Sequence, residues 1–283
     1  MRPLHQIIPP SQMVEGGGFP VKRPFPTHSL SFVDPFLLLD NFGPVTWEPG
    51  EAVGAPDHPH RGFETVTYMM QGSFIHEDSF GHKARIDPGD IQWMTTGSGL
   101  IHSETPAPEI IQKGGTVDGF QIWVNLPAKQ KMTAPSYQEY RADAIARFEH
   151  QGATVRLIAG ELAGHTGPVT PHWPVVMAHI SVPAGHTLTF TLPETHNVLL
   201  YFHSGGGSID DRLVKPGDTA WYKPGSGEIA FTSKEAIELL LLAGAPIGEP
   251  VARYGPFVMN SDAELDQAMA DYRNGKMTPK APE

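Results

Sequence analysis

The strongest constraint on the fold is a stretch of sequence that occurs twice. Residues 65–99, TVTYMMQGSF…IDPGDIQWMTTGSG, can be laid on residues 197–227, NVLLYFHSGGGS…VKPGDTAWYKPGSG. Each copy has an apolar strand that ends in Gly, then Pro-Gly-Asp, an aromatic-containing strand and a Gly-rich turn. Strands that alternate with such turns form sandwiches or barrels. We therefore predict a duplicated all-β protein, with one unit over residues 1–135 and another over residues 136–283.

Further strand-like runs fill most of the chain, and the composition agrees with them. Gly (30) and Pro (28) are both abundant, as in proteins with many short strands and turns. A short C-terminal helix is expected over residues 261–276, because Ser261 and Glu264 form a capping box ahead of an apolar stripe. A second helix is predicted over residues 140–152.

Composition also excludes several classes of protein and of site. The chain has no Cys, so it has no disulfides, no thiolate metal ligands and no cysteine nucleophile. Its formal net charge of −11 disfavours direct binding to nucleic acid. No apolar signal segment opens the chain, and the longest apolar run, residues 239–246, is too short to span a bilayer. We expect a cytoplasmic monomer that does not associate with membranes.

Two pairs of metal-ligand residues lie in the first half of the chain. His58 and His60 are two positions apart in PDHPHRGFETV, and His102 and Glu104 have the same spacing in GLIHSETP. On a strand, such residues point to the same face, so two facing strands would bring all four side chains together. A single H-x-H is a weak signal, but two such pairs beside Gly-rich turns predict a site for a divalent transition metal.

The acidic member of this site is not decided by spacing alone. Glu64 follows the first histidine pair with the same parity as Glu104, so either carboxylate can be the ligand. We expect the carboxylate that is not a ligand, Glu64 or Glu104, to lie in the pocket beside the metal. His76 and His82, in HEDSFGH, fit the pocket and an exposed strand end equally well.

The second half of the chain lacks these residues. Its nearest counterparts to the first histidine pair are His196 and His203, which are seven apart and therefore on opposite strand faces. The segment that corresponds to His102 and Glu104, GSGEIAFTS, has no His. We predict that only the first unit binds a metal.

The motifs that carry these residues resemble those of a known family. G-x3-H-x-H-x3-E-x7-G from Gly54 to Gly72, and PGD…G-x-G-x2-H from Pro88 to His102, are similar to the two metal motifs of the cupin superfamily. The longer string DHPHRGFETVTYMMQGSFIHEDSFGH…DPGDIQWMTTGSGLIHSETP and the tail GEPVARYGPFVMNSDAELDQAMADYRNGKM closely resemble the pirin family. The resemblance covers nearly the whole chain. It implies a bicupin: two jelly-roll β-barrels packed side by side, the C-terminal one degenerate, with a short C-terminal helix.

The resemblance also implies a cofactor and a function. Pirins bind iron, Fe(II) or Fe(III), through three His and one Glu, which correspond here to His58, His60, His102 and Glu104; Ni, Cu, Mn or Zn can occupy such a site. Several pirins are described as quercetin 2,3-dioxygenases. The expected activity is therefore ring opening of a flavonol-like substrate with O2, with Glu104, or else Glu64, as the base. The alternative is a non-enzymatic, redox-sensitive regulator that binds a transcription factor or metabolic enzyme as its protein partner.

Overall fold

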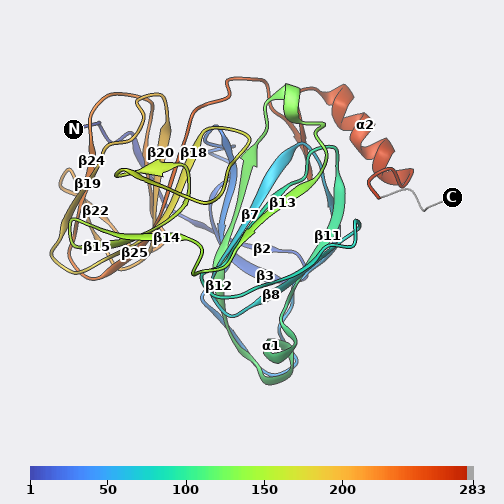
Figure 1. The fold of residues 1–283 in the computed structure, drawn as a ribbon, viewed down its shortest axis with the longest axis horizontal. Helices are drawn as coiled ribbons and strands as arrows, with labels where there is room; N and C mark the ends of the chain where they lie inside the picture. The colour runs from blue at the N-terminus through green and yellow to red at the C-terminus, as the bar shows by residue number, and fades with distance from the viewer. Residues whose placement is uncertain (279–283) are drawn as a thin grey trace. The chain divides into compact units, whose positions relative to one another are not determined.

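A computed structural model describes residues 1–278, and it divides them into two compact units. One unit, here called the histidine unit, comprises residues 12–22, 36–142 and 247–278; the other, the apolar unit, comprises residues 1–11, 23–35 and 143–246. Strands dominate both units (Figure 1). Among the described residues, no helix is long and apolar enough to cross a bilayer.

The histidine unit is built from two antiparallel sheets. Its larger sheet has the order β13 (Ser136–Tyr140), β10 (Ile91–Thr95), β7 (Phe63–Gln71), β12 (Gly115–Asn125), β4 (Phe36–Asn41), β3 (Phe19–Phe25) and β2 (Ser11–Glu15), with β5 (Val45–Trp47) paired to β12. Its smaller sheet has the order β6 (Ala55–His60), β11 (Leu100–Pro106), β8 (Phe74–Asp78) and β9 (Lys83–Ile86).

The apolar unit repeats this arrangement. Its larger sheet has the order β1 (Gln6–Ile8), β23 (Thr219–Tyr222), β20 (Asn197–Ser204), β25 (Ile237–Gly244), β18 (Val175–Val182), β15 (Ala153–Ala159) and β14 (Ala146–His150). Its smaller sheet has the order β19 (Thr187–Phe190), β24 (Ile229–Ser233), β21 (Gly207–Ile209) and β22 (Arg212–Val214). A small hairpin, β16 (Glu161–Leu162) with β17 (His165–Thr166), is added to it.

The predicted duplication agrees with this topology. The two similar stretches of sequence become β7 paired with β10 in one unit and β20 paired with β23 in the other. Position by position, β6, β11, β8 and β9 correspond to β19, β24, β21 and β22. The predicted all-β architecture of two similar units with a C-terminal helix is therefore confirmed.

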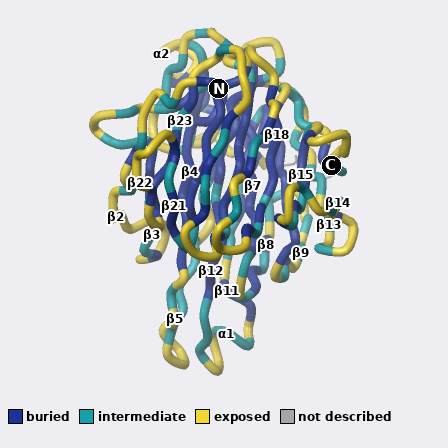
Figure 2. The backbone as a smooth tube through the Cα atoms, turned by 90° about the vertical axis from the view of Figure 1, so that its left-hand side faces the viewer, coloured by how far each residue is buried: buried dark blue, intermediate teal, exposed yellow. Residues whose placement is uncertain are grey.

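Each unit encloses its own apolar side chains, since alternate residues of a strand face inward. In the apolar unit one large buried cluster joins both sheets and includes Leu188, Phe190, Phe202 and Phe231. In the histidine unit a smaller cluster of Phe, Val, Met and Ile side chains lies at one end. Figure 2 shows the strands largely buried and the turns between them exposed.

The predicted C-terminal helix is present as α2 (Asp262–Arg273). The Ser261 side chain accepts a hydrogen bond from the Glu264 backbone N–H, so the capping box forms as expected. The buried face of α2 includes Leu265 and Ala268 and packs with the hairpin of β26 (Ala252–Tyr254) and β27 (Phe257–Met259). Two short helical turns, α1 (Pro108–Lys113) and η1 (Ala128–Gln130), were not predicted.

The helix predicted over residues 140–152 is wrong. This stretch contains the end of β13 and all of β14, which pairs with β15. Ala146 and Phe148, two positions apart, pack on the apolar core, and the alternate residues Arg147 and Glu149 are exposed. That burial fixes a strand, and packing against the neighbouring strand outweighs the local helical preference.

The two units also differ from the predicted division at residue 135, mainly at the chain ends. The first residues of the chain belong to the apolar unit, because β1 pairs with β23. Residues 247–278 belong to the histidine unit, where Asp271 of α2 accepts a hydrogen bond from Arg61. Each unit is therefore completed by the opposite end of the chain.

Candidate metal centre

The three predicted histidine ligands lie on two paired strands of the small sheet in the histidine unit. On the β6–β11 ladder, His58 is directly opposite His102, and His60 is opposite Leu100. Just before β6, Gly54 lies so close to β11 that an added Cβ would be 2.3 Å from the carbonyl oxygen of Glu104. Only glycine lets the two strands approach this closely, which explains the Gly four positions ahead of the first histidine.

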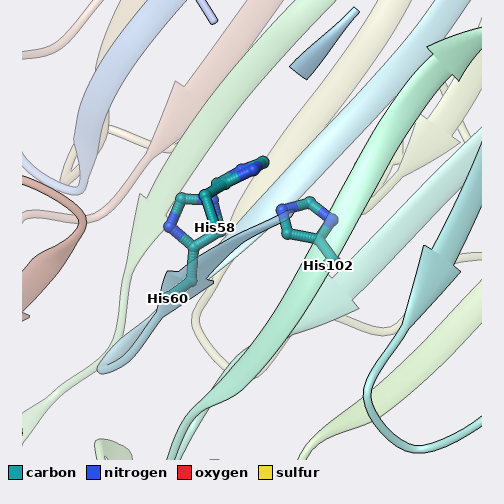
Figure 3. Close-up of side chains that lie close together, drawn as sticks. All are labelled: His58, His60 and His102. Carbon is teal, nitrogen blue, oxygen red and sulfur yellow. The ribbon is translucent and has the colours of Figure 1, made fainter. Parts of the chain in front are cut away.

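The three imidazole rings form a compact group. Ring centroids are 4.7 Å apart for His58 and His60, 4.3 Å for His58 and His102, and 5.0 Å for His60 and His102. One nitrogen from each ring lies within 4.8 Å of the other two, and Figure 3 shows the rings turned toward one another. The structure thus brings together the three histidines that the sequence singled out.

Hydrogen bonds hold the ring nitrogens that are not needed for a metal. Nδ1 of His58 is 2.8 Å from the carbonyl oxygen of Pro56, and Nδ1 of His60 is 3.4 Å from that of Pro256. A carbonyl oxygen can only accept, so each Nδ1 carries the proton and each Nε2 keeps its lone pair. Nε2 of His102 is buried and has no hydrogen-bond partner among the described residues.

Burial keeps these imidazoles neutral. Desolvation lowers the pKa of His60 well below its ordinary value, and the neighbouring His58 lowers it further. Desolvation likewise lowers the pKa of His102, with added contributions from His60 and His58. Neutral imidazole is the form that binds metals, so His60 and His102 do not need to lose a proton to accept an ion near neutral pH.

Glu104, the predicted fourth ligand, lies next to His102 but belongs to a second group. Its ligand atom is within 4.8 Å of one nitrogen each of His102 and His76. Across the sheet it is directly opposite His76 on β8. Its Oε1 accepts a hydrogen bond of 2.8 Å from the hydroxyl of Thr67 on β7. His102 is therefore shared by two overlapping groups, and Glu104 lies on the side away from His58 and His60.

His76 is a member of this cluster that spacing alone did not place. It is fully buried, and its Nδ1 is 3.3 Å from Nδ1 of His102. Burial lowers its pKa, and the charge of Glu104 raises it in part. In the sequence, His76 shares a strand face with Phe74 and Asp78, which are two positions away on either side. That spacing does not show that His76 lies opposite Glu104, because the pairing depends on the register between β8 and β11.

His82, in contrast, lies at the edge of the cluster. Its side chain is about one-third exposed (32%), stacks on Tyr137 with ring centroids 4.3 Å apart, and is 3.0 Å from Oε1 of Glu139. Its ring centroid is 5.9 Å from that of His76. His82 therefore lies beside His76 and Tyr137 and outside both groups of ligand atoms among the described residues.

The prediction that Glu64 lines the metal pocket is wrong. Strand β6 ends at His60, and Gly62 turns the chain with a φ of +92° before β7 begins. Glu64 and Thr67 are three apart on β7, so they lie on opposite faces of that strand, and Thr67 is the one that reaches Glu104. The Oε1 atom of Glu64 instead accepts a hydrogen bond of 2.9 Å from Thr95. The sequence spacing assumed one unbroken strand from His58 to Glu64. Because the chain turns at Gly62, Glu64 does not face the same side as the two histidines.

Aromatic side chains enclose one side of the histidine group. His60 has ring contacts with Phe63 and Trp123, both with centroids 5.1 Å away. The guanidinium of Arg253, from β26, lies 4.6 Å from the centroid of the Trp123 ring. These neighbours dehydrate His60 and place a positive charge near the cluster.

The donor set fits a divalent transition metal. Three imidazoles converge, their other nitrogens are held or buried, and a carboxylate lies beside His102. Imidazole with carboxylate suits Fe, Cu, Ni and Zn better than Mg or Ca. In the apolar unit, the corresponding strands β19 and β24 point Leu188, Phe190 and Phe231 inward instead. Those side chains offer no ligand atoms.

Comparisons with known proteins agree with this architecture. The family model named Pirin matches residues 18–124, and that of the pirin C-terminal cupin domain matches residues 177–278. A pirin-like protein of Solanum lycopersicum is 41% identical over 93% of this chain and 88% of its own length. Pirin-1 of Arabidopsis thaliana is 40% identical over 93% of this chain and 90% of its own. A crystal structure of quercetin 2,3-dioxygenase from Acinetobacter baumannii superimposes with a TM-score of 0.92 at 35% identity, covering 98% of each chain.

Proposed function

This chain belongs to the pirin family of two-domain cupin proteins, and from that membership we propose that it is a metal-dependent dioxygenase that opens a ring of a flavonol with O2. The observation that carries the proposal is the convergence of three imidazoles, one of which, His102, lies beside the carboxylate of Glu104. A structurally similar protein of 35% identity is a quercetin 2,3-dioxygenase, which supports a flavonol as the substrate class.

We assign His58, His60 and His102 as metal ligands and Glu104 as the carboxylate of the centre. Iron is the proposed ion, and Ni, Cu, Mn or Zn can occupy the same nitrogen-rich set. When bound, a redox-active ion lets electron density pass between an oxygen-donor substrate and O2. The carbonyls of Pro56 and Pro256 fix the His58 and His60 rings in the required tautomer.

Glu104 is proposed to take the proton from the flavonol hydroxyl. Its Oε1 accepts from Thr67, and Oε2 has no hydrogen-bond partner among the described residues, so that oxygen is available as a ligand or a proton acceptor. Removal of this proton gives the substrate the anionic oxygen that a cation binds well. Trp123 and Phe63 pack against His60 and exclude water from that side of the centre.

Turnover of a flavonol tests the proposal. Protein loaded with Fe(II) without air is mixed with quercetin in air, and loss of the flavonol absorbance and release of CO are followed. We expect turnover by the wild type and by His28→Ala, which changes an exposed histidine, and none by His60→Ala. Glu104→Gln should lower kcat by roughly 10²-fold or more. Equal rates in wild type and His60→Ala would contradict the assignment.

A further inference from the structure

Two groups of ligand atoms overlap at a single residue, His102. One group is formed by His58, His60 and His102, and the other by His76, His102 and Glu104. In each group the ligand atoms lie within 4.8 Å of one another. The second group contains two imidazoles and one carboxylate, which is the donor set of many non-haem Fe(II) oxygenases.

The two groups face opposite nitrogens of the His102 ring. Figure 3 shows one ring nitrogen of His102 pointing toward His58 and His60 and the other pointing away from them. The nitrogen that lies away is Nδ1, which is 3.3 Å from Nδ1 of His76. The nitrogen toward the other two histidines is Nε2, which has no hydrogen-bond partner among the described residues.

The spacing between His76 and His102 suits two ligands of one ion. Nitrogens bound at about 2.1 Å are roughly 3.0 Å apart at a right angle and roughly 3.4 Å apart in a tetrahedral arrangement. The observed 3.3 Å lies in this range, and it is longer than a well-formed hydrogen bond to nitrogen or oxygen, about 2.9 Å. Nε2 of His76 is buried and makes no hydrogen bond within the described residues, so no partner there fixes its tautomer.

We propose that the cluster offers two alternative positions to one metal ion, the second formed by His76, Nδ1 of His102 and Glu104. A neutral imidazole has a lone pair on only one nitrogen at a time, so the two positions exclude each other. Binding at the second position moves the proton of His102 from Nδ1 to Nε2. The inference rests on the proposed metal centre and adds His76 to its ligands.

Cobalt(II) tests it, because its visible spectrum reports the ligands around the ion. Metal content per chain is measured after gel filtration of the full chain, together with the spectrum. The wild type should hold about one Co(II) per chain. The variant His58→Ala/His60→Ala, which keeps only the second position, should still hold about one, bound more weakly and with a changed spectrum. Adding His76→Ala should remove it, and adding His28→Ala should not.

The outcomes separate this inference from the proposed function. A wild type that binds no Co(II) would refute both. A wild type with about one ion, and a folded double variant with none, would refute only the second position. Circular dichroism checks folding. If the double variant is unfolded, the same two additions are made to His58→Gln; retention of its ion after His76→Ala would then refute the proposal.

Discussion

At the scale of single residues, Thr67 determines how the Glu104 carboxylate is held. Its hydroxyl is 2.8 Å from Oε1 of Glu104 and 3.0 Å from Oε1 of Gln121. The hydroxyl has one hydrogen and gives it to the carboxylate, which can only accept. The carboxylate of Glu104 and the amide oxygen of Gln121 therefore share one donor. A short chain of hydrogen bonds through Thr67 thus supports the carboxylate.

Loss of this chain should weaken the metal centre. In Thr67→Val the carboxylate loses a donor and stays in place, so we expect metal affinity to fall roughly 10- to 100-fold. Competition with a chromophoric chelator measures the dissociation constant. Thr46→Val, which removes an exposed hydroxyl in the same unit, is the control and should leave affinity unchanged. Equal affinities for wild type and Thr67→Val would show that this hydrogen bond does not support the ligand.

Lys131 is a buried cation whose hydrogen-bond acceptors are neutral groups. Its ammonium donates to the carbonyl oxygens of Gly62 (2.8 Å) and Val258 (3.0 Å) and to Oδ1 of Asn125 (2.7 Å). Burial lowers its pKa to about 8. The three acceptors belong to the loop after the first histidine pair, the C-terminal hairpin and the end of β12, so one side chain joins three segments.

Replacement of Lys131 by Met should therefore destabilise the histidine unit. The apolar chain fits the same space but leaves three buried acceptors without their donor, and we expect a loss of about 2–4 kcal/mol in the free energy of unfolding. Urea denaturation measures it. Lys129→Met, at an exposed position two residues earlier, should change the midpoint little. If both variants unfold at the wild-type midpoint, these bonds contribute nothing net.

The histidines could be predicted from the sequence, and the carboxylate only in part. Strand parity placed His58, His60 and His102 correctly because β6 and β11 are regular at those residues. The same rule failed for Glu64, since Gly62 turns the chain between the histidine pair and β7. His76 was out of reach for a different reason: its place depends on register between strands, which follows from the whole sheet.

At the scale of elements, the C-terminal hairpin and α2 support the loop that carries the first histidine pair. The Pro256 carbonyl contacts His60, and the Val258 backbone N–H donates to the Arg61 carbonyl oxygen at 3.1 Å. Arg61 also donates to Oδ2 of Asp271 at 2.9 Å, with both side chains largely buried. Burial alone would raise the pKa of Asp271, but hydrogen bonds from Arg61, Lys276 and Gln267 outweigh it and lower the pKa to about 2.

This pKa fixes the pH range over which the α2 contact stabilises the fold. The folded value, about 2, is below the ordinary 3.8, so the stabilisation is complete above pH 3.8 and is lost as the pH falls toward 2. Asp271→Asn should cost about 3 kcal/mol at neutral pH, and its difference from wild type should shrink across that range. Urea unfolding at several pH values measures it, with exposed Asp266→Asn as control. A difference that does not vary with pH would contradict the ion pair.

Element boundaries show which local signals survive packing. The Ser261–Glu264 capping box predicted α2 correctly because its partners are within one turn. Residues 146–150 became a strand because burial of alternate side chains against β15 outweighed their helical pattern. Hydrogen bonds between residues close in sequence can be predicted from a single sequence, whereas pairing between distant strands cannot.

At the scale of the whole molecule, metal binding should stabilise one unit only. Ligand atoms converge in the histidine unit, and the corresponding strands of the apolar unit present Leu188, Phe190 and Phe231. Free ion at about 100 times its dissociation constant stabilises a folded protein by about 2.7 kcal/mol. Chelation should therefore lower the unfolding temperature of one calorimetric transition. His102→Ala should abolish the response, and an equal response in that variant would place the ion elsewhere.

The duplicated fold could be predicted from the sequence, but the unit to which each end of the chain belongs could not. Pro-Gly-Asp turns and flanking strands occur in both copies, so two β units could be predicted. Nothing in the residues around β1 or α2 shows which unit they complete, because that depends on pairing with β23 and on contact with Arg61.

This exchange of ends has a consequence for how the protein is made. At roughly 5–20 residues per second, a ribosome needs about 7 to 27 seconds to pass from residue 142 to residue 278. During that interval the strands that carry the three histidines already exist, but the Pro256 carbonyl that orients His60 does not. A nascent or truncated chain therefore has the ligands without their final arrangement, and the ability to hold an ion correctly marks a chain that has been synthesised to its end.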